Sequence, residues 1–165
     1  MNFDISNMAF RDQEREDDIH SIAEIVESTG FFYDAEVSIA VELIRECLEK
    51  GYLSGYYFVF ADYEERTLAY TCYGPIPGTK SAFDLYWIVT HNDYRGYGIG
   101  RSLLQETEKK VKEMGGTALY AETSSREKYI STHTFYRKNV FTETARIKDF
   151  YDIGDDKIMY KKQLV

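Results

Sequence analysis

A glycine-rich segment, Arg95–Arg101 (RGYGIGR), constrains the fold of this chain more than any other stretch. It follows the apolar run Leu85–Val89 and opens a helix-like run, Ile99–Met114. Glycines placed where a strand passes into a helix expose backbone N–H groups at a helix N-terminus, which carries about half of an elementary positive charge and binds anions. Glycine also permits a positive φ and a close approach of the backbone to a ligand. The segment therefore predicts a strand–loop–helix unit that binds the phosphates of a cofactor.

Two well-known phosphate loops do not fit this segment. A Walker loop would continue into Gly-Lys-Ser or Gly-Lys-Thr, and the spacing of Gly96, Gly98 and Gly100 departs from the dinucleotide pattern G-x-G-x-x-G. The strand before the segment is also a late one in the chain. A turn that only lets a helix pack on a sheet is the structural alternative. The flanking Arg95 and Arg101 favour anion binding, because they add positive charge.

Hydrophobic periodicity divides the chain into alternating helices and strands. Apolar residues at helical spacing predict the helices Asp17–Thr29, Ala35–Lys50, Ile99–Met114 and Tyr129–Lys138. Apolar and β-branched runs predict the strands Tyr56–Tyr63, Thr67–Tyr73, Ala82–Thr90, Thr117–Thr123, Phe141–Tyr151 and Lys157–Leu164, with a further strand at Asn7–Arg11. This order predicts one α/β domain, residues 1–165, built on a mixed sheet with helices on its faces.

Three local features are also predicted. The run Leu85–Val89 is nearly all apolar, so this part of its strand is expected to be buried on both faces. Residues 154–156 (GDD) are expected to form the turn of a C-terminal hairpin. The third helix is expected to point a set of side chains inward: Leu103, Leu104, Thr107, Val111 and Met114.

Composition limits the classes of partner. The net charge of −8 argues against a nucleic-acid partner. No apolar run reaches about 18 residues, so no membrane span is expected, and the first residues do not have the pattern of a secretory leader. The two cysteines, Cys47 and Cys72, are expected to be buried thiols in a reducing cytoplasm. The three histidines have no metal-ligand spacing, so no metal site is expected.

A second motif, Phe135–Lys138 (FYRK), lies on the last predicted helix. Together with the glycine segment it resembles the GNAT superfamily of acyl-CoA-dependent N-acetyltransferases. The family's loop pattern, R/Q-x-x-G-x-G/A, is filled by Arg95, Gly98 and Gly100. Its later pattern, roughly N-x-x-A-x-x-F-Y-x-K-x-G-F, corresponds to Tyr129, Thr132, Phe135, Tyr136, Lys138, Val140 and Phe141. The resemblance covers about Thr67–Leu164.

The chain departs from the family's patterns at several positions. Asn92 stands where many members have proline, and Tyr129 and Thr132 replace asparagine and alanine. Val140 replaces a glycine that usually leaves the helix in a left-handed conformation. A β-branched residue is unfavourable there, so Asn139 is expected to take the left-handed conformation instead.

The resemblance implies a fold and a cofactor. The fold would be a central, mostly antiparallel sheet of six to seven strands with a splayed pair of strands, flanked by about four helices. The cofactor would be acetyl-CoA, with its pyrophosphate on the glycine loop and its pantetheine arm along the strand near residues 88–90. The implied cofactor-binding residues are Ile88, Val89, Thr90, Arg95, Gly96, Tyr97, Gly98, Ile99, Gly100, Arg101, Ser102, Thr123, Thr132, Phe135, Tyr136 and Lys138.

The resemblance also implies direct transfer of an acetyl group to a primary amine of a small molecule or protein. Tyr136 occupies the position of the family's general-acid tyrosine. Asp84 or an ordered water is the expected base, with Glu122 as a second candidate, although Asp84 could simply begin its strand. The expected acceptor-binding residues are Phe31, Phe32, Tyr33 and Tyr86, although the first three could instead plug the core. A non-catalytic acyl-CoA sensor is the alternative function. The sequence does not fix the oligomeric state, and homodimers are common in the family.

Overall fold

The computed structural model describes residues 3–165. The chain divides into two compact units, each assembled from two segments of sequence. Among the described residues, the first unit comprises residues 3–74 and 87–109, and the second comprises residues 75–86 and 110–165. Strand β4 (Ala82–Thr90) is divided between the two units: its first half belongs to the second unit and its end to the first.

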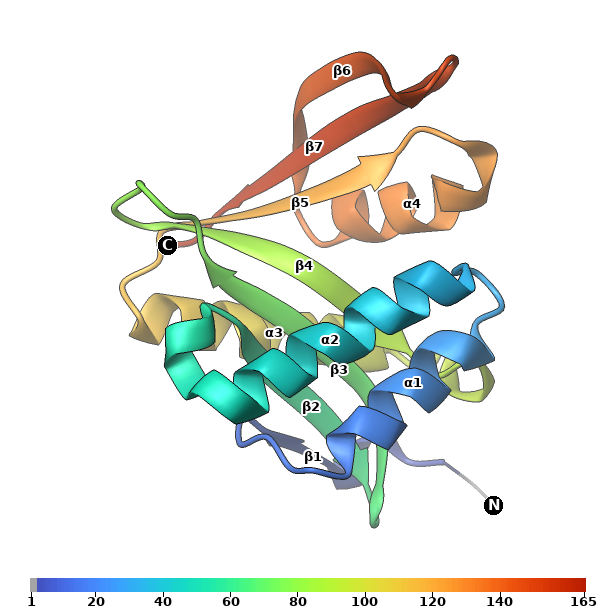
Figure 1. The fold of residues 1–165 in the computed structure, drawn as a ribbon, viewed down its shortest axis with the longest axis vertical. Coiled ribbons are helices and arrows are strands. Elements are labelled where there is room, and N and C mark those ends of the chain that lie inside the picture. Colours follow the sequence, from blue (N-terminus) through green and yellow to red (C-terminus); the bar gives the residue numbers. More distant parts are fainter. Residues whose placement is uncertain (1–2) are drawn as a thin grey trace. The chain divides into compact units, whose positions relative to one another are not determined.

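The first unit contains an antiparallel set of strands covered by helices on both faces. Its strands are β1 (Met8–Arg11), β2 (Tyr57–Tyr63), β3 (Arg66–Pro75, but for its last residue) and the end of β4. Helices α1 (Asp18–Ser28) and α2 (Asp34–Lys50) lie on one face, and α3 (Ile99–Glu113) lies on the other (Figure 1). Short 3-10 turns at Ile5–Asn7, Gly51–Ser54 and Asn92–Tyr94 connect these elements.

Alternation along β2 and β3 explains how both faces are filled. Phe58 pairs with Cys72 and Phe60 pairs with Tyr70, and all of these side chains belong to the core under α1 and α2. Thr71 points to the other face, where its hydroxyl lies 2.7 Å from that of Thr107 on α3. The prediction of buried thiols is confirmed, because both cysteines are buried and free.

The second unit is a smaller sheet with one complete helix and the end of α3, residues 110–113. Strands β5 (Ala118–Ser124), β6 (Thr142–Asp152) and β7 (Asp155–Gln163) join the first half of β4 in the order β4-β5-β7-β6. The β4–β5 pair is parallel, whereas β5–β7 and β6–β7 are antiparallel. A 3-10 turn (Glu127–Tyr129) leads into α4 (Ile130–Lys138), which packs beside β5 and β7 (Figure 1). The predicted mixed sheet is confirmed, with seven strands and four α-helices in the described residues.

Three local predictions are wrong. Residues Leu85–Val89 are not buried on both faces, since Tyr86 is 40% exposed and two of its neighbours are half-buried. Met114 is exposed because α3 ends at Glu113, one residue before it. The hairpin turns at residues 153–154, and Asp155 already belongs to β7, where it is buried.

Candidate active site

The glycine loop has the backbone geometry that its sequence predicts. Gly96 and Gly98 have φ values of 85° and 86°, a region that only glycine occupies without strain. The amide of Ser102 donates to the carbonyl of Gly98 at 3.2 Å, which is the first helical hydrogen bond of α3. The N–H groups of Ile99, Gly100 and Arg101 precede it and have no acceptor within the helix. This arrangement favours an anion at the start of α3.

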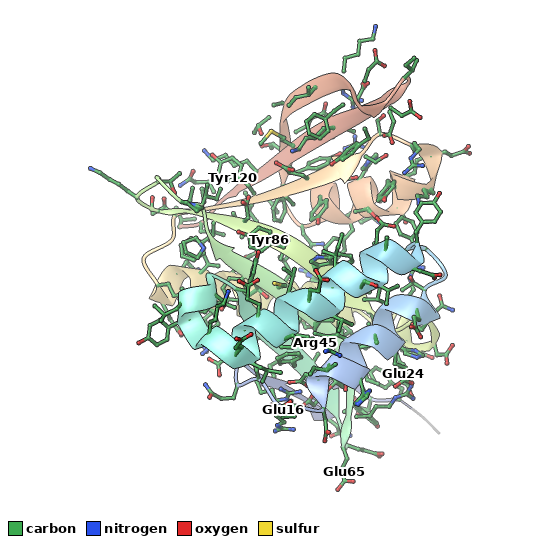
Figure 2. All side chains as sticks on the ribbon, viewed as in Figure 1. Glu16, Glu24, Arg45, Glu65, Tyr86 and Tyr120 are labelled. Carbon is green, nitrogen blue, oxygen red and sulfur yellow. The ribbon has the colours of Figure 1, made fainter. Side chains whose placement is uncertain are left out.

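The loop is anchored to the first unit where it leaves β4. The backbone N–H of His91 donates to Leu68 at 2.8 Å, and that of Asn92 donates to the Ser28 hydroxyl at 3.0 Å. The imidazole of His91 lies 3.3 Å from the guanidinium of Arg66, which forms an ion pair of 2.5 Å with Glu24. Glu24 projects from α1 (Figure 2). The entry to the loop is therefore attached to both α1 and β3.

The N-terminal segment also contacts the glycine loop, which the sequence analysis did not predict. The ring of Phe3 lies 5.5 Å from that of Tyr94 and 4.9 Å from that of Tyr97. A Cβ built on Gly98 would lie 3.6 Å from Cδ1 of Ile5. The signal in the sequence was weak: two apolar residues, Phe3 and Ile5, before the first strand. The contacts support one side of the loop.

Tyr136 is buried on α4 within the second unit. Its ring stacks on Tyr160 at 5.4 Å and meets Phe141 at 5.1 Å between centroids. Burial raises the pKa of the Tyr136 hydroxyl well above its ordinary value, and Tyr160 adds to the shift. The hydroxyl therefore keeps its proton at neutral pH, which a general acid requires.

Buried polar contacts fix α4 against the end of β5. His133 Nε2 donates to the Ser124 carbonyl at 2.8 Å and lies 3.1 Å from the Thr123 hydroxyl. The Thr123 hydroxyl also lies 2.9 Å from the Ser124 carbonyl. Thr123, a predicted cofactor-binding residue, thus has its side chain engaged within the protein. These contacts place Tyr136, one helical turn after His133, against β7.

The end of α4 corrects a prediction. Val140 itself is left-handed, with φ of 70°, whereas Asn139 has φ of −98°. The backbone N–H of Val140 donates to Arg137 at 3.1 Å and that of Phe141 donates to Tyr136 at 3.0 Å, the two bonds of a Schellman motif. The motif turns the chain so that Phe141 packs under Tyr136. The packing of Phe141 therefore overrides the backbone preference of Val140.

Asp84 lies on the face of the second unit opposite to α4. It pairs with Tyr120 in the parallel β4–β5 register, so it shares a face with Tyr120 and Glu122. Thr123, which contacts α4, points the other way. Figure 2 labels Tyr86 on β4 and Tyr120 on β5, the two strands that carry this face. Burial raises the pKa of Asp84, Glu122 raises it further, and Lys157 lowers it. Asp84 is half-buried, and its raised pKa makes it a stronger base than an ordinary aspartate.

The β4–β5 ladder is short. It joins Ala82–Asp84 to Ala118–Tyr120, and within the described residues of this unit it extends no further along β4. Strand β5 pairs with β7 over its whole length, Ala118–Ser124. The two strands therefore part after Asp84, and this leaves Tyr86 exposed.

The remaining predicted residues fall into two groups. In the first unit, Val89 and Ile99 are buried, Ile88, Thr90 and Ser102 are half-buried, and Arg95, Tyr97 and Arg101 are exposed. Phe32 packs against the core with its ring 5.0 Å from that of Trp87, Phe31 is half-buried, and Tyr33 is exposed at the start of α2. In the second unit, Thr132 and Phe135 are half-buried, Lys138 is exposed, and Tyr86 lies on the strand of Asp84.

Neither cysteine is a suitable nucleophile. Burial and the neighbouring Glu14 raise the pKa of Cys47 to about 12. Burial also raises the pKa of Cys72 well above its ordinary value. Both thiols therefore stay protonated, whereas attack requires the thiolate.

Residues 3–165 contain neither a metal-binding cluster nor a helix that could span a membrane. Across this range no three His, Cys, Asp or Glu side chains gather in a metal-binding arrangement. Every helix in the described part of the chain is too short or too polar to span a lipid bilayer.

The sequence matches a protein-family model described as the acetyltransferase (GNAT) family over residues 19–139. The matched stretch includes the glycine loop, Asp84 and Tyr136. A search of curated protein sequences finds no match to the chain.

Solved structures give the same result. A protein of Desulfovibrio desulfuricans assigned to the GNAT family of acetyltransferases is 42% identical, with a TM-score of 0.94 over 96% of this chain and 99% of its own. An aminoglycoside 6′-N-acetyltransferase complexed with coenzyme A is 15% identical, with a TM-score of 0.75 over 96% and 97% of the two chains. The ribosomal-protein-S18-alanine N-acetyltransferase of Escherichia coli is 16% identical, with a TM-score of 0.74 over 95% and 94%. The last two share the fold alone.

Proposed function

The chain belongs to the GNAT family of acetyltransferases, and we propose that it transfers the acetyl group of acetyl-CoA directly to a primary amine of a small molecule or a protein. The observation that carries this proposal is the placement of two groups in the second unit. Tyr136, which holds its proton, and Asp84, a half-buried carboxylate, lie toward opposite faces of the strand layer that contains β5. An acid and a base separated in this way can serve two different reactants.

The glycine loop fits the pyrophosphate of CoA. The outward N–H groups at the start of α3 supply donors, and the exposed Arg95 and Arg101 supply positive charge. The strand segment at residues 88–90 would hold the pantetheine arm by backbone hydrogen bonds. When bound, acetyl-CoA supplies an acetyl group that is activated as a thioester.

The residues of the second unit would manage two protons. An alkylamine has a pKa of about 10 and is protonated at neutral pH, so the acceptor must lose a proton before its nitrogen can attack. Asp84 would take this proton, directly or through water. Tyr136 would supply a proton to the departing thiolate, whose thiol has a pKa of about 8.5. Each such group typically contributes about 10²–10⁴ in rate.

The test is a panel of primary amines incubated with acetyl-CoA and the full-length protein, with release of free CoA followed by a thiol reagent. Small diamines, amino sugars and peptides with a free N-terminus sample the two acceptor classes. We expect one class to release CoA and to gain an acetyl group by mass spectrometry. Binding of CoA by calorimetry without acetylation of any amine would contradict the proposal and favour a sensor.

A further inference from the structure

The face of the second unit that carries Asp84 and Glu122 also holds an enclosed lysine. Lys157, on β7, pairs with Ser124 in the antiparallel register and therefore shares the face of Glu122. Its Nζ lies 2.5 Å from Oε2 of Glu122, and its side chain is only 16% exposed. Lysines usually extend their ammonium groups into water, so the surroundings hold this one in place.

An aromatic ring provides the second contact of this lysine. The Nζ of Lys157 lies 4.4 Å from the centroid of the Phe150 ring, which belongs to β6. This is a favourable distance for a cation above a ring. The ammonium is therefore fixed between a carboxylate from β5 and a ring from β6.

The charges that act on Asp84 come from two neighbouring strands. Burial and the Glu122 carboxylate raise the pKa of Asp84, and the Lys157 ammonium lowers it. On β6, burial, Glu122 and Asp155 raise the pKa of Tyr151, so the tyrosine stays neutral. Two carboxylates that share a site without a cation retain a proton between them. The positive charge of Lys157 therefore opposes protonation of Asp84.

We propose that Lys157 is a positioning residue for proton removal from the acceptor: it holds Glu122 in an ion pair and keeps Asp84 ionised and able to accept a proton. This inference rests on the proposed function, in which Asp84 is the base. The proton leaves the ammonium nitrogen of the acceptor and forms an O–H bond on the Asp84 carboxylate. Lys157 keeps all three of its protons, so its contribution is purely electrostatic and geometric.

The test is a pH titration of the Asp84 carboxyl by ¹³C NMR in the full-length protein. Lys157→Met removes the charge and keeps the length of the side chain. We expect the titration midpoint of Asp84 to rise by about one pH unit. On the acidic limb, kcat/KM should fall about tenfold, and it should recover above the new midpoint. Lys157→Arg should keep the wild-type midpoint, and an unchanged midpoint in Lys157→Met overturns the proposal.

A second substitution separates charge from structure. Adding Glu122→Gln to Lys157→Met removes the repelling carboxylate, so the midpoint should return most of the way to the wild-type value. Persistence of the full shift in the double variant overturns the proposal. If Lys157→Met does not fold, Glu122→Gln alone should lower the midpoint, because it leaves the Lys157 charge unopposed. An unchanged midpoint in that variant overturns the proposal as well.

Lys162→Met is the matched control. Lys162 lies on the same strand but on the opposite face, with its Nζ 5.9 Å from the Phe141 ring. Its loss should leave the Asp84 midpoint in place, and a shift as large as that of Lys157→Met overturns the proposal.

The titration needs no turnover, so the proposed function and the role of Lys157 can be tested separately. A wild-type protein that acetylates no amine contradicts the proposed function, even where Lys157→Met shifts the midpoint. Undiminished turnover in Asp84→Asn with an unchanged pH profile contradicts the assignment of Asp84 as the base, and leaves acetyl transfer itself in place. An unchanged midpoint in a protein that acetylates amines through Asp84 contradicts the Lys157 inference alone.

Discussion

The glycine loop of the first unit and the end of α4 in the second unit both turn the chain through left-handed residues, but they do so differently. In the loop these residues are Gly96 and Gly98, which adopt a positive φ without strain. At the end of α4 the residue is Val140, for which the same region costs about 1–3 kcal/mol. The loop is thus shaped without backbone strain, whereas the end of α4 is held by packing of Phe141 against Tyr136.

The two regions also offer different chemistry. The loop presents backbone N–H groups and exposed arginines, so we expect its substitutions to change the affinity for CoA. Helix α4 presents a buried hydroxyl that keeps its proton, so we expect substitution of Tyr136 to change turnover instead. Substitutions in the two regions test whether CoA affinity depends on the loop and turnover depends on α4.

The largest effect is expected for Tyr136→Phe. The change removes the proposed proton donor and leaves the ring contacts with Tyr160 and Phe141 in place. Turnover should fall at least tenfold, because a general acid contributes about 10²–10⁴ in rate. The affinity for CoA, measured by calorimetry, should stay within about twofold, since the change leaves the loop and its N–H donors intact. Unchanged turnover would remove Tyr136 from the mechanism.

Tyr70→Phe is the matched control for this prediction. Tyr70 is also fully buried, and burial raises the pKa of its hydroxyl well above the ordinary value. Its hydroxyl has no hydrogen-bond partner among the described residues, and its ring belongs to the core of the first unit. Removing the hydroxyl should leave turnover unchanged and should not lower the melting temperature. A loss of turnover as large as that of Tyr136→Phe would show that the assay reports packing rather than acid catalysis.

The next effect is expected for Gly98→Ala. With φ at 86°, alanine is strained by about 1–2 kcal/mol, and the loop must change shape to relieve it. The N–H groups at the start of α3 would then point differently, so the affinity for CoA should fall by about tenfold in calorimetry. The turnover at saturating acetyl-CoA should change much less.

Gly78→Ala serves as the control for Gly98→Ala. Gly78 has φ of 81° and lies in the loop between β3 and β4, where an added Cβ meets no atom within 4 Å. The variant should lose similar stability and keep its affinity for CoA. An equal loss of affinity in both variants would show that strain anywhere in the chain disturbs binding.

Local patterns were sufficient to predict most of the fold and the shape of the loop. Helical spacing and flanking glycines predicted each helix to within one or two residues at either end, for example α2 at Asp34–Lys50. Glycine at positions 96 and 98 permits the left-handed conformations that the loop adopts there. These features depend on residues that are close in the sequence, so the sequence alone is enough to predict them.

Features that depend on distant partners could not be predicted in this way. The exposure of Tyr86 follows from where β5 leaves β4, after the pairing of Asp84 with Tyr120. The enclosure of Lys157 follows from a carboxylate on β5 and a ring on β6. The residue type alone does not decide these outcomes, because a tyrosine or a lysine can be either exposed or enclosed. The family resemblance suggested Asp84 and Tyr136, but only the register shows that they lie toward opposite faces.

The smallest effect, and the one with the opposite sign, is expected for Val140→Gly. Glycine relieves the left-handed strain but gains entropy in the unfolded chain, so the net stabilisation should be about 1 kcal/mol, or about 2–4 °C in melting temperature. Turnover should not change, because the Schellman bonds to Arg137 and Tyr136 use backbone atoms that glycine retains. Glu64→Gly is the control: Glu64 is also left-handed, at φ of 56°, but it is unbranched at Cβ and should gain less. A lower melting temperature for Val140→Gly than for the wild type would show that the valine side chain stabilises the end of α4. In that case the two left-handed turns would differ in packing rather than in strain.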